Sequence, residues 1–315
     1  MSKYRSGLPQ LSRDFFLTDG GLETFLYFQQ GIDLPDFAAF PLLETPNGRA
    51  EITRYMERHI QIALDARWGF VMETPTWRAN RDWGEKLGYD RGRLAEANRE
   101  SVRFMAALRE RYETPETRIV ISGNIGPRGD GYNPSDLMTP VESALYHLDQ
   151  IDAFVEAGAD LVTALTMTHV EEAVGITKAA QAARIPVVIS FTTETDGNLP
   201  TGQNLGEAVE AVDAMTDEGP AYYMVNCAHP NHFEDALRTE AAWINRLRGI
   251  RANASTKSHE ELDNSTVLDE GDPVELGAQY RTIRERMPHV TILGGCCGTD
   301  HRHVEQICSA CKLAA

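Results

Sequence analysis

Short apolar runs and longer amphipathic runs alternate along the whole chain, and this alternation constrains the fold more than any other feature. Eight short apolar runs are predicted strands, at about residues 15–19, 70–73, 118–122, 160–166, 186–191, 221–226, 250–253 and 290–293. Helical periodicity marks eight longer stretches, at about residues 49–67, 91–112, 141–157, 171–183, 205–215, 233–247, 273–287 and 301–311. Because eight such repeats require parallel crossovers and favour closure, the sequence predicts an α/β fold, a single (β/α)₈ TIM barrel.

The domain organisation predicted from the sequence is equally simple. A chain of 315 residues fits one such barrel, and its composition does not shift on the scale of a domain. We therefore expect one domain over residues 1–315, with the barrel core at about residues 14–311. The polar stretch 254–272 is predicted to be a long loop after the seventh strand, at the catalytic end of the barrel.

Charge and cysteine content exclude several classes of function. The formal net charge of −17 disfavours nucleic acid and anionic membranes as partners. The sequence has no apolar run of about 18 residues and no signal-peptide pattern at its start. Its five cysteines are an odd number, and three of them cluster, which favours metal binding in a reducing, cytoplasmic setting. The oligomeric state stays open, and a homo-oligomer is compatible with the sequence.

Polar residues gather at the predicted carboxyl ends of the strands, where barrel active sites form. They are Asp19, Glu73, Asn124, Thr166, Thr193, Glu194, Cys227, Asn253, Cys296 and Cys297. Neighbouring strands lie about 4.8 Å apart, so sulfurs from the sixth and eighth strands can converge on one ion. Successive strand residues face opposite sides, so the chain must turn at the cysteine pair. Gly294, Gly295 and Gly298 would permit the unusual dihedral angles of that turn.

Three thiolates with one open position predict a particular chemistry. A Zn²⁺ ion held by three thiolates carries a net negative charge, which makes the site a poor generator of hydroxide. The same site suits a fourth thiolate, because metal coordination deprotonates a thiol whose free pKa is about 8.5. The predicted reaction is S-alkylation, in which a substrate thiolate attacks an activated methyl group.

Other interpretations of the cysteines stay open at this level. The adjacent pair could be ordinary buried residues, or a reversible disulfide. Cys308 and Cys311 have the spacing of a zinc ligand pair, so a closed structural site with Cys296 and Cys297 is a further alternative.

Five segments, spread in order from residue 18 to residue 300, resemble the homocysteine S-methyltransferase family. They are TDGGLET at 18–24, GNIGPRGDGY at 123–132, SFTTETDGNLPTGQNLGEAV at 190–209, VNCAHP at 225–230 and GGCCGTD at 294–300. The resemblance implies a zinc barrel that methylates homocysteine to methionine, with Zn²⁺ bound by Cys227, Cys296 and Cys297 as the catalytic centre.

The resemblance also implies a binding site for the amino-acid acceptor. It assigns Asp19, Gly20 and Gly21 to this site, with the Asp19 carboxylate suited to an ammonium group. Two asparagines at strand ends, Asn124 and Asn226, are candidates to orient substrate or to support a cysteine, with a purely structural role as the alternative.

One position departs from the family pattern. Many members carry a glutamate followed by threonine at the end of the fourth strand, where the glutamate helps to bind the amine of homocysteine. This chain has Leu165 and Thr166 there. We expect either that Glu73 replaces the lost carboxylate or that the enzyme accepts a different thiol.

The methyl donor and the competing functions complete the sequence-based expectations. A chain filled by one barrel favours a small donor such as S-methylmethionine or a betaine. Its cationic group would suit the aromatic loop residues Trp77, Trp83 and Tyr132. Alternatives are a non-catalytic zinc or redox-sensing barrel, and a phosphate-binding lyase or isomerase. The latter ranks lowest because no basic residue is predicted at a strand end.

Overall fold

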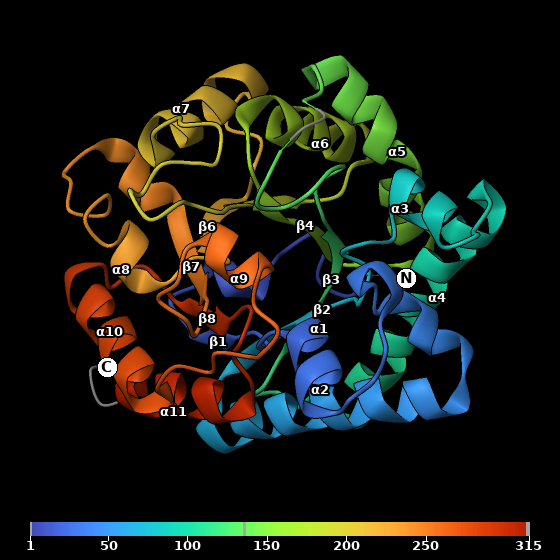
Figure 1. The fold of residues 1–315 in the computed structure, drawn as a ribbon, viewed down its shortest axis with the longest axis horizontal. Helices are drawn as coiled ribbons and strands as arrows, with labels where there is room; N and C mark the ends of the chain where they lie inside the picture. Colours follow the sequence, from blue (N-terminus) through green and yellow to red (C-terminus); the bar gives the residue numbers. More distant parts are fainter. Residues whose placement is uncertain (1, 135–136, 313–315) are drawn as a thin grey trace.

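A computed structural model describes residues 2–134 and 137–312, and its centre is a closed barrel of eight parallel strands in sequence order (Figure 1). The strands are β1 Phe16–Leu17, β2 Gly69–Glu73, β3 Ile119–Ile125, β4 Leu161–Met167, β5 Val187–Phe191, β6 Tyr222–Asn226, β7 Leu247–Ala252 and β8 Ile292–Gly295. The last strand pairs with the first, and this closure confirms the predicted (β/α)₈ fold.

Helices form a ring around the barrel (Figure 1). The longer ones are α2 Pro46–Ala66, α4 Arg91–Tyr112, α5 Pro140–Ala157, α6 Val170–Ala183, α7 Leu205–Thr216, α10 Pro273–Arg286 and α11 His301–Lys312. Short helices lie in the connections, at α1 Leu22–Thr24, α3 Arg81–Lys86, α8 Pro230–Phe233 and α9 His259–Asp263. In the part of the chain that the structure describes, no helix combines the length and apolarity that crossing a membrane requires.

Local sequence signals explain where a helix such as α5 begins and ends. Thr139 and Glu142 form a capping box at its start, and Pro140 occupies the first position of the helix. Gly158 ends the helix in the left-handed conformation, with φ of 90°. These signals fix the bounds of α5 close to the prediction from periodicity.

The predicted helix at 233–247 is wrong. α8 ends at Phe233, a 3₁₀ turn runs from Ala242 to Arg246, and β7 begins at Leu247. Trp243 in this turn packs so closely on α7 that a Cβ atom on Gly206 would lie 2.5 Å from its indole Nε1. Burial of this indole outweighs the helix propensity of the segment. The predicted loop 254–272 also contains a short helix, α9.

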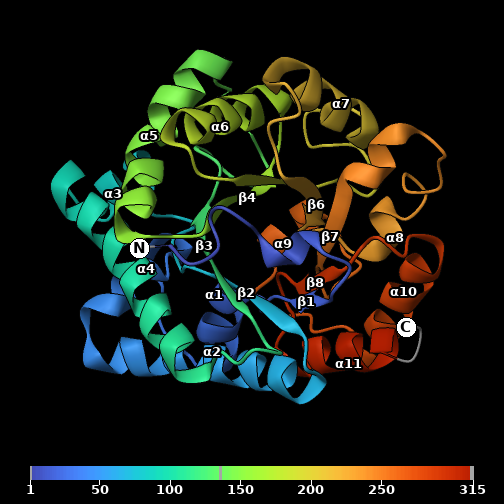
Figure 2. The ribbon, with the colours of Figure 1, turned by 180° about the vertical axis from the view of Figure 1, so that it is seen from behind.

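The amino-terminal end of the barrel interior is apolar and closed. Its inward side chains form one cluster, which comprises Leu8, Phe16, Val71, Val120, Leu161, Val188, Tyr222, Met224 and Ile292. The N-terminal segment crosses this end of the barrel, and Leu8 joins the cluster from it (Figure 2). The backbone N–H groups of Lys3 and Tyr4 donate to Asp160 Oδ1, which ties the segment down. This end therefore contributes to the core.

The same inward positions become polar toward the carboxyl ends of the strands. Alternate residues of a strand share a face. The residues two or four positions after members of the apolar cluster therefore lie on the same inward face, and they include Glu73, Asn124, Leu165, Asn226 and Cys296. The strand register places Arg251 of β7 beside Asn226 of β6 and Gly294 of β8. The alternation that builds the core thus also aims these side chains into the other end of the barrel.

Candidate active site

A cavity of about 360 Å³ opens at the carboxyl ends of the strands. The residues assigned to the zinc and acceptor sites line it, namely Asp19, Gly20, Gly21, Glu73, Asn124, Thr166, Asn226, Cys227, Cys296 and Cys297. Thr193, Glu194 and Asn253, which were also predicted at strand ends, are not among its lining residues. The structure therefore brings together residues that lie up to 278 positions apart in the sequence. Concave sites at this end of a barrel are where its chemistry takes place.

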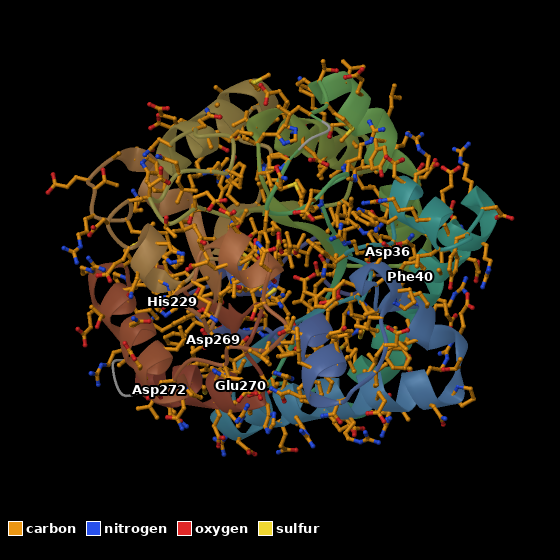
Figure 3. All side chains as sticks on the ribbon, in the orientation of Figure 1. Asp36, Phe40, His229, Asp269, Glu270 and Asp272 are labelled. Carbon is orange, nitrogen blue, oxygen red and sulfur yellow. A yellow bond between two sulfur atoms is a disulfide. The ribbon has the colours of Figure 1, made fainter. Side chains whose placement is uncertain are left out.

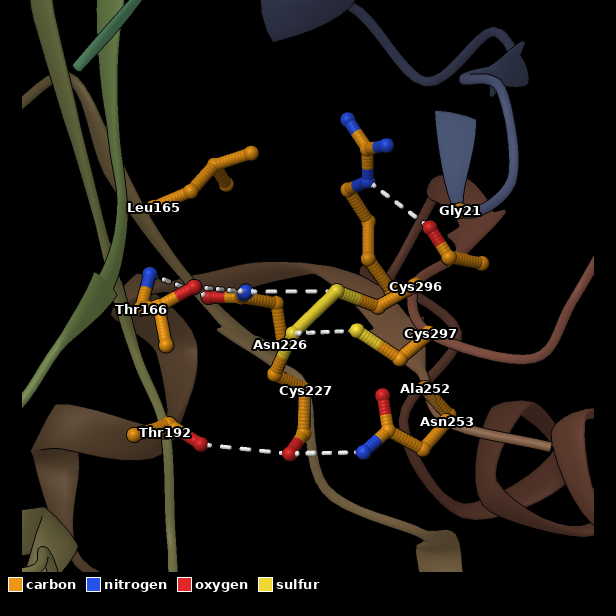
Figure 4. Close-up of a disulfide and its surroundings, with 12 residues drawn as sticks. Gly21, Leu165, Thr166, Thr192, Asn226, Cys227, Ala252, Asn253, Cys296 and Cys297 are labelled. Atoms are coloured by element: carbon orange, nitrogen blue, oxygen red, sulfur yellow. Dashed lines mark hydrogen bonds between the residues drawn. A yellow bond between two sulfur atoms is a disulfide. The ribbon is translucent and has the colours of Figure 1, made fainter. Parts of the chain in front are cut away.

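Three sulfur atoms lie together in this cavity (Figure 4). The Sγ atoms of Cys227, Cys296 and Cys297 lie within 4.8 Å of one another. Contrary to the expectation of three separate thiolates, Cys227 and Cys296 form a disulfide in this structure. Cys297 stays free, and its Sγ lies 3.9 Å from that of Cys227.

The donor set fits a zinc ion once the disulfide is reduced. Tetrahedral bonds of about 2.3 Å from zinc to sulfur hold two thiolates roughly 3.8 Å apart. The separation of 3.9 Å between Cys227 and Cys297 already has this value. Two bonded sulfurs cannot both act as thiolates, so reduction must precede metal binding.

The closed structural zinc site proposed as an alternative is not formed. Cys308 and Cys311 lie in α11, where both are buried against the core. Within residues 2–134 and 137–312, the sulfur cluster contains Cys227, Cys296 and Cys297 and neither of these two. The fourth position around the cluster is therefore not taken by another cysteine.

Cys227 is held in an unusual backbone conformation. Its φ is 54°, a left-handed value that is uncommon for any residue other than glycine. Its carbonyl oxygen accepts hydrogen bonds from Asn253 Nδ2 at 3.0 Å, His259 Nε2 at 2.8 Å and Thr192 Oγ1 at 3.3 Å. A strained backbone conformation persists only where surrounding contacts hold it in place, as these three hydrogen bonds do here. The conformation directs the Cys227 sulfur toward Cys296 and Cys297.

The cysteine doublet sits on a turn directly after β8. The N–H of Cys296 donates to the Ala252 carbonyl of β7 at 2.8 Å. Of the three glycines expected to take unusual dihedral angles, Gly298 does so, with φ of 80°. Gly294 and Gly295 lie within β8 and serve another purpose, because a Cβ atom there would lie 1.9 Å and 2.0 Å from threonine hydroxyls.

Asn226 ties the fourth strand to the sulfur cluster. Its Oδ1 accepts from the N–H of Thr166 at 2.8 Å, and its Nδ2 donates to Thr166 Oγ1 at 2.9 Å. The same Nδ2 lies 3.7 Å from Cys296 Sγ. Thr166 has φ of 62°, an outlier for a β-branched residue. Both the amide oxygen and the amide nitrogen of Asn226 are thus engaged with the protein.

Arg251 is the main site residue that the sequence-based reasoning missed. Its Nη2 donates to Asp19 Oδ1 at 2.7 Å, and its Nη1 lies 4.0 Å from Glu73 Oε1. Tyr55 donates its hydroxyl to the other oxygen of Asp19 at 3.2 Å. Asp19, expected to receive an ammonium group, is thus already paired. The prediction that no basic residue stands at a strand end was wrong, because β7 ends at Ala252, one residue before the predicted end, and Arg251 is its second-last residue.

Burial sets the protonation of this cluster. It raises the pKa of Glu73 to about 7, although the nearby Arg251 guanidinium acts in the opposite direction. Burial alone would lower the pKa of Arg251, but the carboxylates of Asp19 and Glu73 raise it. The guanidinium therefore stays charged, while Glu73 changes protonation near neutral pH.

The aromatic residues expected near a cationic donor are largely engaged elsewhere. Tyr132 stacks on His259 with centroids 3.9 Å apart, and its hydroxyl lies 3.6 Å from Cys297 Sγ. The guanidinium of Arg78 covers Trp77 at 4.5 Å and Trp83 at 3.7 Å, and Trp83 does not line the cavity. Trp77 and Tyr132 do line the cavity, together with Phe28 and Phe37, which the sequence did not single out.

Further carboxylates line the cavity besides Asp19 and Glu73. They are Glu23, Asp130, Asp263 and Asp269, and Asp269 lies next to Glu270 on the segment before α10 (Figure 3). Burial raises the pKa of Glu23 to about 7 and raises that of Asp263 as well. Together with Phe28 and Phe37, these groups give the entrance an acidic and partly aromatic character.

Known proteins are similar to this chain in sequence and in fold. In sequence it is 25% identical to the homocysteine S-methyltransferase of Escherichia coli (strain K12) over 305 residues, which covers 91% of this chain and 92% of that protein. In structure it is similar to the E. coli homocysteine methyltransferase MmuM. The metallated form of MmuM gives a TM-score of 0.73 at 20% identity, with 96% of each chain covered. The oxidized form gives 0.77 at 18% identity, with 97% and 99% covered. At these identities the structural likeness supports the fold alone.

The family model for homocysteine S-methyltransferase provides the decisive comparison. It matches residues 16–311, from the first strand to the last turn of α11. The match includes the sulfur cluster, the Asp19 turn and every strand of the barrel, and it supports an S-methyltransferase activity. The chain therefore belongs to the homocysteine S-methyltransferase family.

Proposed function

We propose that this protein is a zinc-dependent S-methyltransferase that transfers a methyl group from a small cationic donor to a thiol, with homocysteine as the first candidate acceptor and methionine as its product. The observation that carries the proposal is the convergence of three sulfur atoms at the wall of an open cavity. Family membership supports the same reaction class.

Cys227, Cys296 and Cys297 would hold the zinc ion. When bound, the ion would deprotonate an incoming thiol and keep its sulfur electron-rich. Without a metal, burial raises the pKa of the Cys297 thiol to about 11, so the cavity by itself does not favour thiolates. A metal at the three sulfurs supplies the positive charge that the proposed chemistry needs.

The protein's own residues orient the reacting groups. Asn226 holds Cys296 through its side-chain amide, and His259 and Asn253 hold the peptide of Cys227. The acidic residues at the entrance would attract a sulfonium or quaternary ammonium donor, and the aromatic rings of Phe28 and Phe37 suit its methyl groups. The methyl group would then pass to the thiol sulfur, and the donor would leave as a neutral thioether or amine.

The proposed chemistry requires reduced cysteines, because the Cys227–Cys296 disulfide removes two of the three thiolates. We therefore propose a reducing compartment such as the cytoplasm as the working location.

The test is turnover by the reduced, zinc-loaded protein. Homocysteine is offered with S-methylmethionine or with a betaine, and methionine formation is followed. We expect turnover with at least one donor, its loss after zinc is removed by a chelator, and its recovery when zinc is restored. Turnover that persists without zinc would contradict the metal's role, and absence of turnover with every thiol and donor would contradict the reaction.

A further inference from the structure

The inner end of the cavity contains buried polar atoms that have no partner. Among the described residues, Arg251 Nη1, Glu73 Oε2 and Asn124 Oδ1 make no hydrogen bond. All three side chains line the cavity, and Arg251 is only 4% exposed. Buried polar groups are normally hydrogen-bonded, so three unpaired atoms facing one cavity indicate a place where a ligand binds.

The remaining nitrogens of Arg251 fix its guanidinium in place. Nε donates to the Gly295 carbonyl at 3.1 Å, and Nη2 donates to Asp19 Oδ1 and the Gly20 carbonyl. Nη1 lies 4.0 Å from Glu73 Oε1, which is too long for a hydrogen bond. A guanidinium that is held on two sides and free on the third is preorganised to bind an anion.

This end of the cavity offers few free hydrogen-bond acceptors to an ammonium group. Leu165, which is 5% exposed, lines the wall where the family pattern has a glutamate. Both oxygens of Asp19 already accept hydrogen bonds, from Arg251 and Tyr55. Glu73 is partly protonated at neutral pH, because burial raises its pKa to about 7. Arg251 Nη1 is therefore a hydrogen-bond donor without a protein partner that this end of the cavity offers to a ligand.

We propose that Arg251 binds the carboxylate of the acceptor through Nη1, and that the enzyme selects carboxylate-bearing thiols without requiring an amine. The inference rests on the proposed thiol methylation and adds the class of acceptor. Arg251 pairs in register with Gly294, two residues before Cys296, so the anchor and the sulfur cluster lie on adjacent strands. A short thiol acid can then reach both.

Arg78 is the other cationic residue among the described residues that line the cavity. Its Nη2 lies 3.8 Å from the Asp130 carboxylate, and its guanidinium packs against the rings of Trp77 and Trp83. Its Nε also lacks a hydrogen bond. We take Arg251 as the anchor because it lies on the strand beside the sulfur cluster, in register with Gly294.

Three acceptors of equal chain length test the proposal. Homocysteine carries both charged groups, 4-mercaptobutyrate lacks the amine, and 3-mercaptopropylamine lacks the carboxylate. We expect loss of the carboxylate to lower kcat/KM by about 100-fold or more, and loss of the amine to lower it by no more than about 10-fold. The reverse order would overturn the proposal.

Variants separate this role from a structural one. Arg251→Met should lower kcat/KM for the two acids but not for the amine, and Arg251→Lys should have an intermediate effect because a lysine lacks the planar fork. If Arg251→Met does not fold, Asp19→Asn/Arg251→Met, which removes both buried charges, takes its place. Equal losses for all three acceptors would overturn the proposal, and so would a change in preference caused by Arg78→Met instead.

A matched control and a binding measurement complete the test. Arg109 forms a comparable buried ion pair with Asp160, at 2.6 Å, outside the cavity. Arg109→Lys should lower stability and leave the acceptor preference unchanged. Calorimetry on the zinc-loaded protein should show 4-mercaptobutyrate binding more tightly than 3-mercaptopropylamine, and the opposite ranking overturns the inference. If no thiol is methylated, the proposed function fails, while this ranking still decides the role of Arg251.

Discussion

The two ends of the barrel interior use the same strands for opposite purposes. At the amino end, inward side chains such as Phe16, Val120 and Tyr222 pack together under Leu8. At the carboxyl end, the same faces carry Glu73 and other polar groups, several of them without a partner. The amino end, which is closed by apolar packing, contributes stability. The carboxyl end is open and tolerates unpaired polar atoms and unusual backbone conformations.

Backbone strain follows the same division. Thr166 and Cys227, both at the carboxyl ends of strands, have left-handed φ values of 62° and 54°. No residue of the apolar cluster does, among those that the structure describes. Such strain is costly, so its occurrence at Thr166 and Cys227, beside the three sulfurs, indicates that this end is shaped for chemistry rather than for stability.

The largest expected effect comes from removing one sulfur at the open end. Cys297→Ser replaces a thiolate ligand by a hydroxyl, so we expect loss of bound zinc and a decrease in kcat of about 10⁴-fold. Metal analysis and turnover assays measure both. Cys311→Ser, in the buried face of α11, is the control and should keep its zinc and its turnover. Retention of one zinc per chain by Cys297→Ser would contradict the assigned ligand set.

Removing a core side chain at the amino end of the barrel should lower stability rather than zinc binding. Phe16→Ala removes a fully buried ring from the apolar cluster and leaves a cavity, so we expect the free energy of unfolding to fall by about 3–5 kcal/mol. Denaturant unfolding measures this change. The folded fraction should bind zinc as the wild type does, and weakened zinc binding would mean that the two ends are coupled.

The polar end should make stability depend on pH. Because the folded-state pKa of Glu73 is about 7 and its ordinary value is 4.5, the folded protein keeps a proton that the unfolded chain releases between these values. Stability should therefore fall as pH rises from 4.5 through 7, by up to about 3 kcal/mol.

Unfolding experiments across this pH range test the contribution of Glu73. Glu73→Gln should reduce the dependence of the free energy of unfolding on pH. Glu23, whose pKa is also raised to about 7, should account for part of the pH dependence that remains. Glu171→Gln, on the exposed surface of α6, should keep the wild-type slope. An unchanged slope in Glu73→Gln would show that this carboxyl does not hold the proton.

The smallest expected effect concerns the apolar residue within the polar end. Leu165→Glu would place a carboxylate beside the cavity, so the preference for homocysteine over 4-mercaptobutyrate should rise about tenfold through a charge-assisted hydrogen bond to the amine. Leu165→Gln, which has the same shape without the charge, should raise it less. Equal ratios in both variants and the wild type would show that the amine does not reach this position.

The predictability of the fold follows from its repetition. Strands covered on both faces are continuous apolar runs, so alternation with helices was enough to predict the barrel. The segment 233–247 was mispredicted because the packing of Trp243 on Gly206 is a tertiary effect that no local pattern contains. The short helices such as α9 lie in connections where the sequence has no long periodic pattern.

The predictability of the site differed between residues at strand ends and residues within strands. The cysteines and Asp19 were found because they follow apolar runs or recognisable motifs. Arg251 was missed because it lies inside β7, four residues after the strand begins. Its inward direction becomes evident only from its register with Asn226 and Gly294. A reversible disulfide was one of several open alternatives, but its formation between Cys227 and Cys296 was not predicted, because spacing alone does not set the oxidation state or the pairing.

X-ray absorption at the zinc edge of the reduced, zinc-loaded protein tests the central claim most directly. The account predicts three sulfur neighbours at about 2.3 Å in the protein alone, and four after an acceptor thiol is added. An unchanged number of sulfur neighbours on addition of homocysteine and of 4-mercaptobutyrate, or a zinc shell without the three cysteine sulfurs, would contradict it.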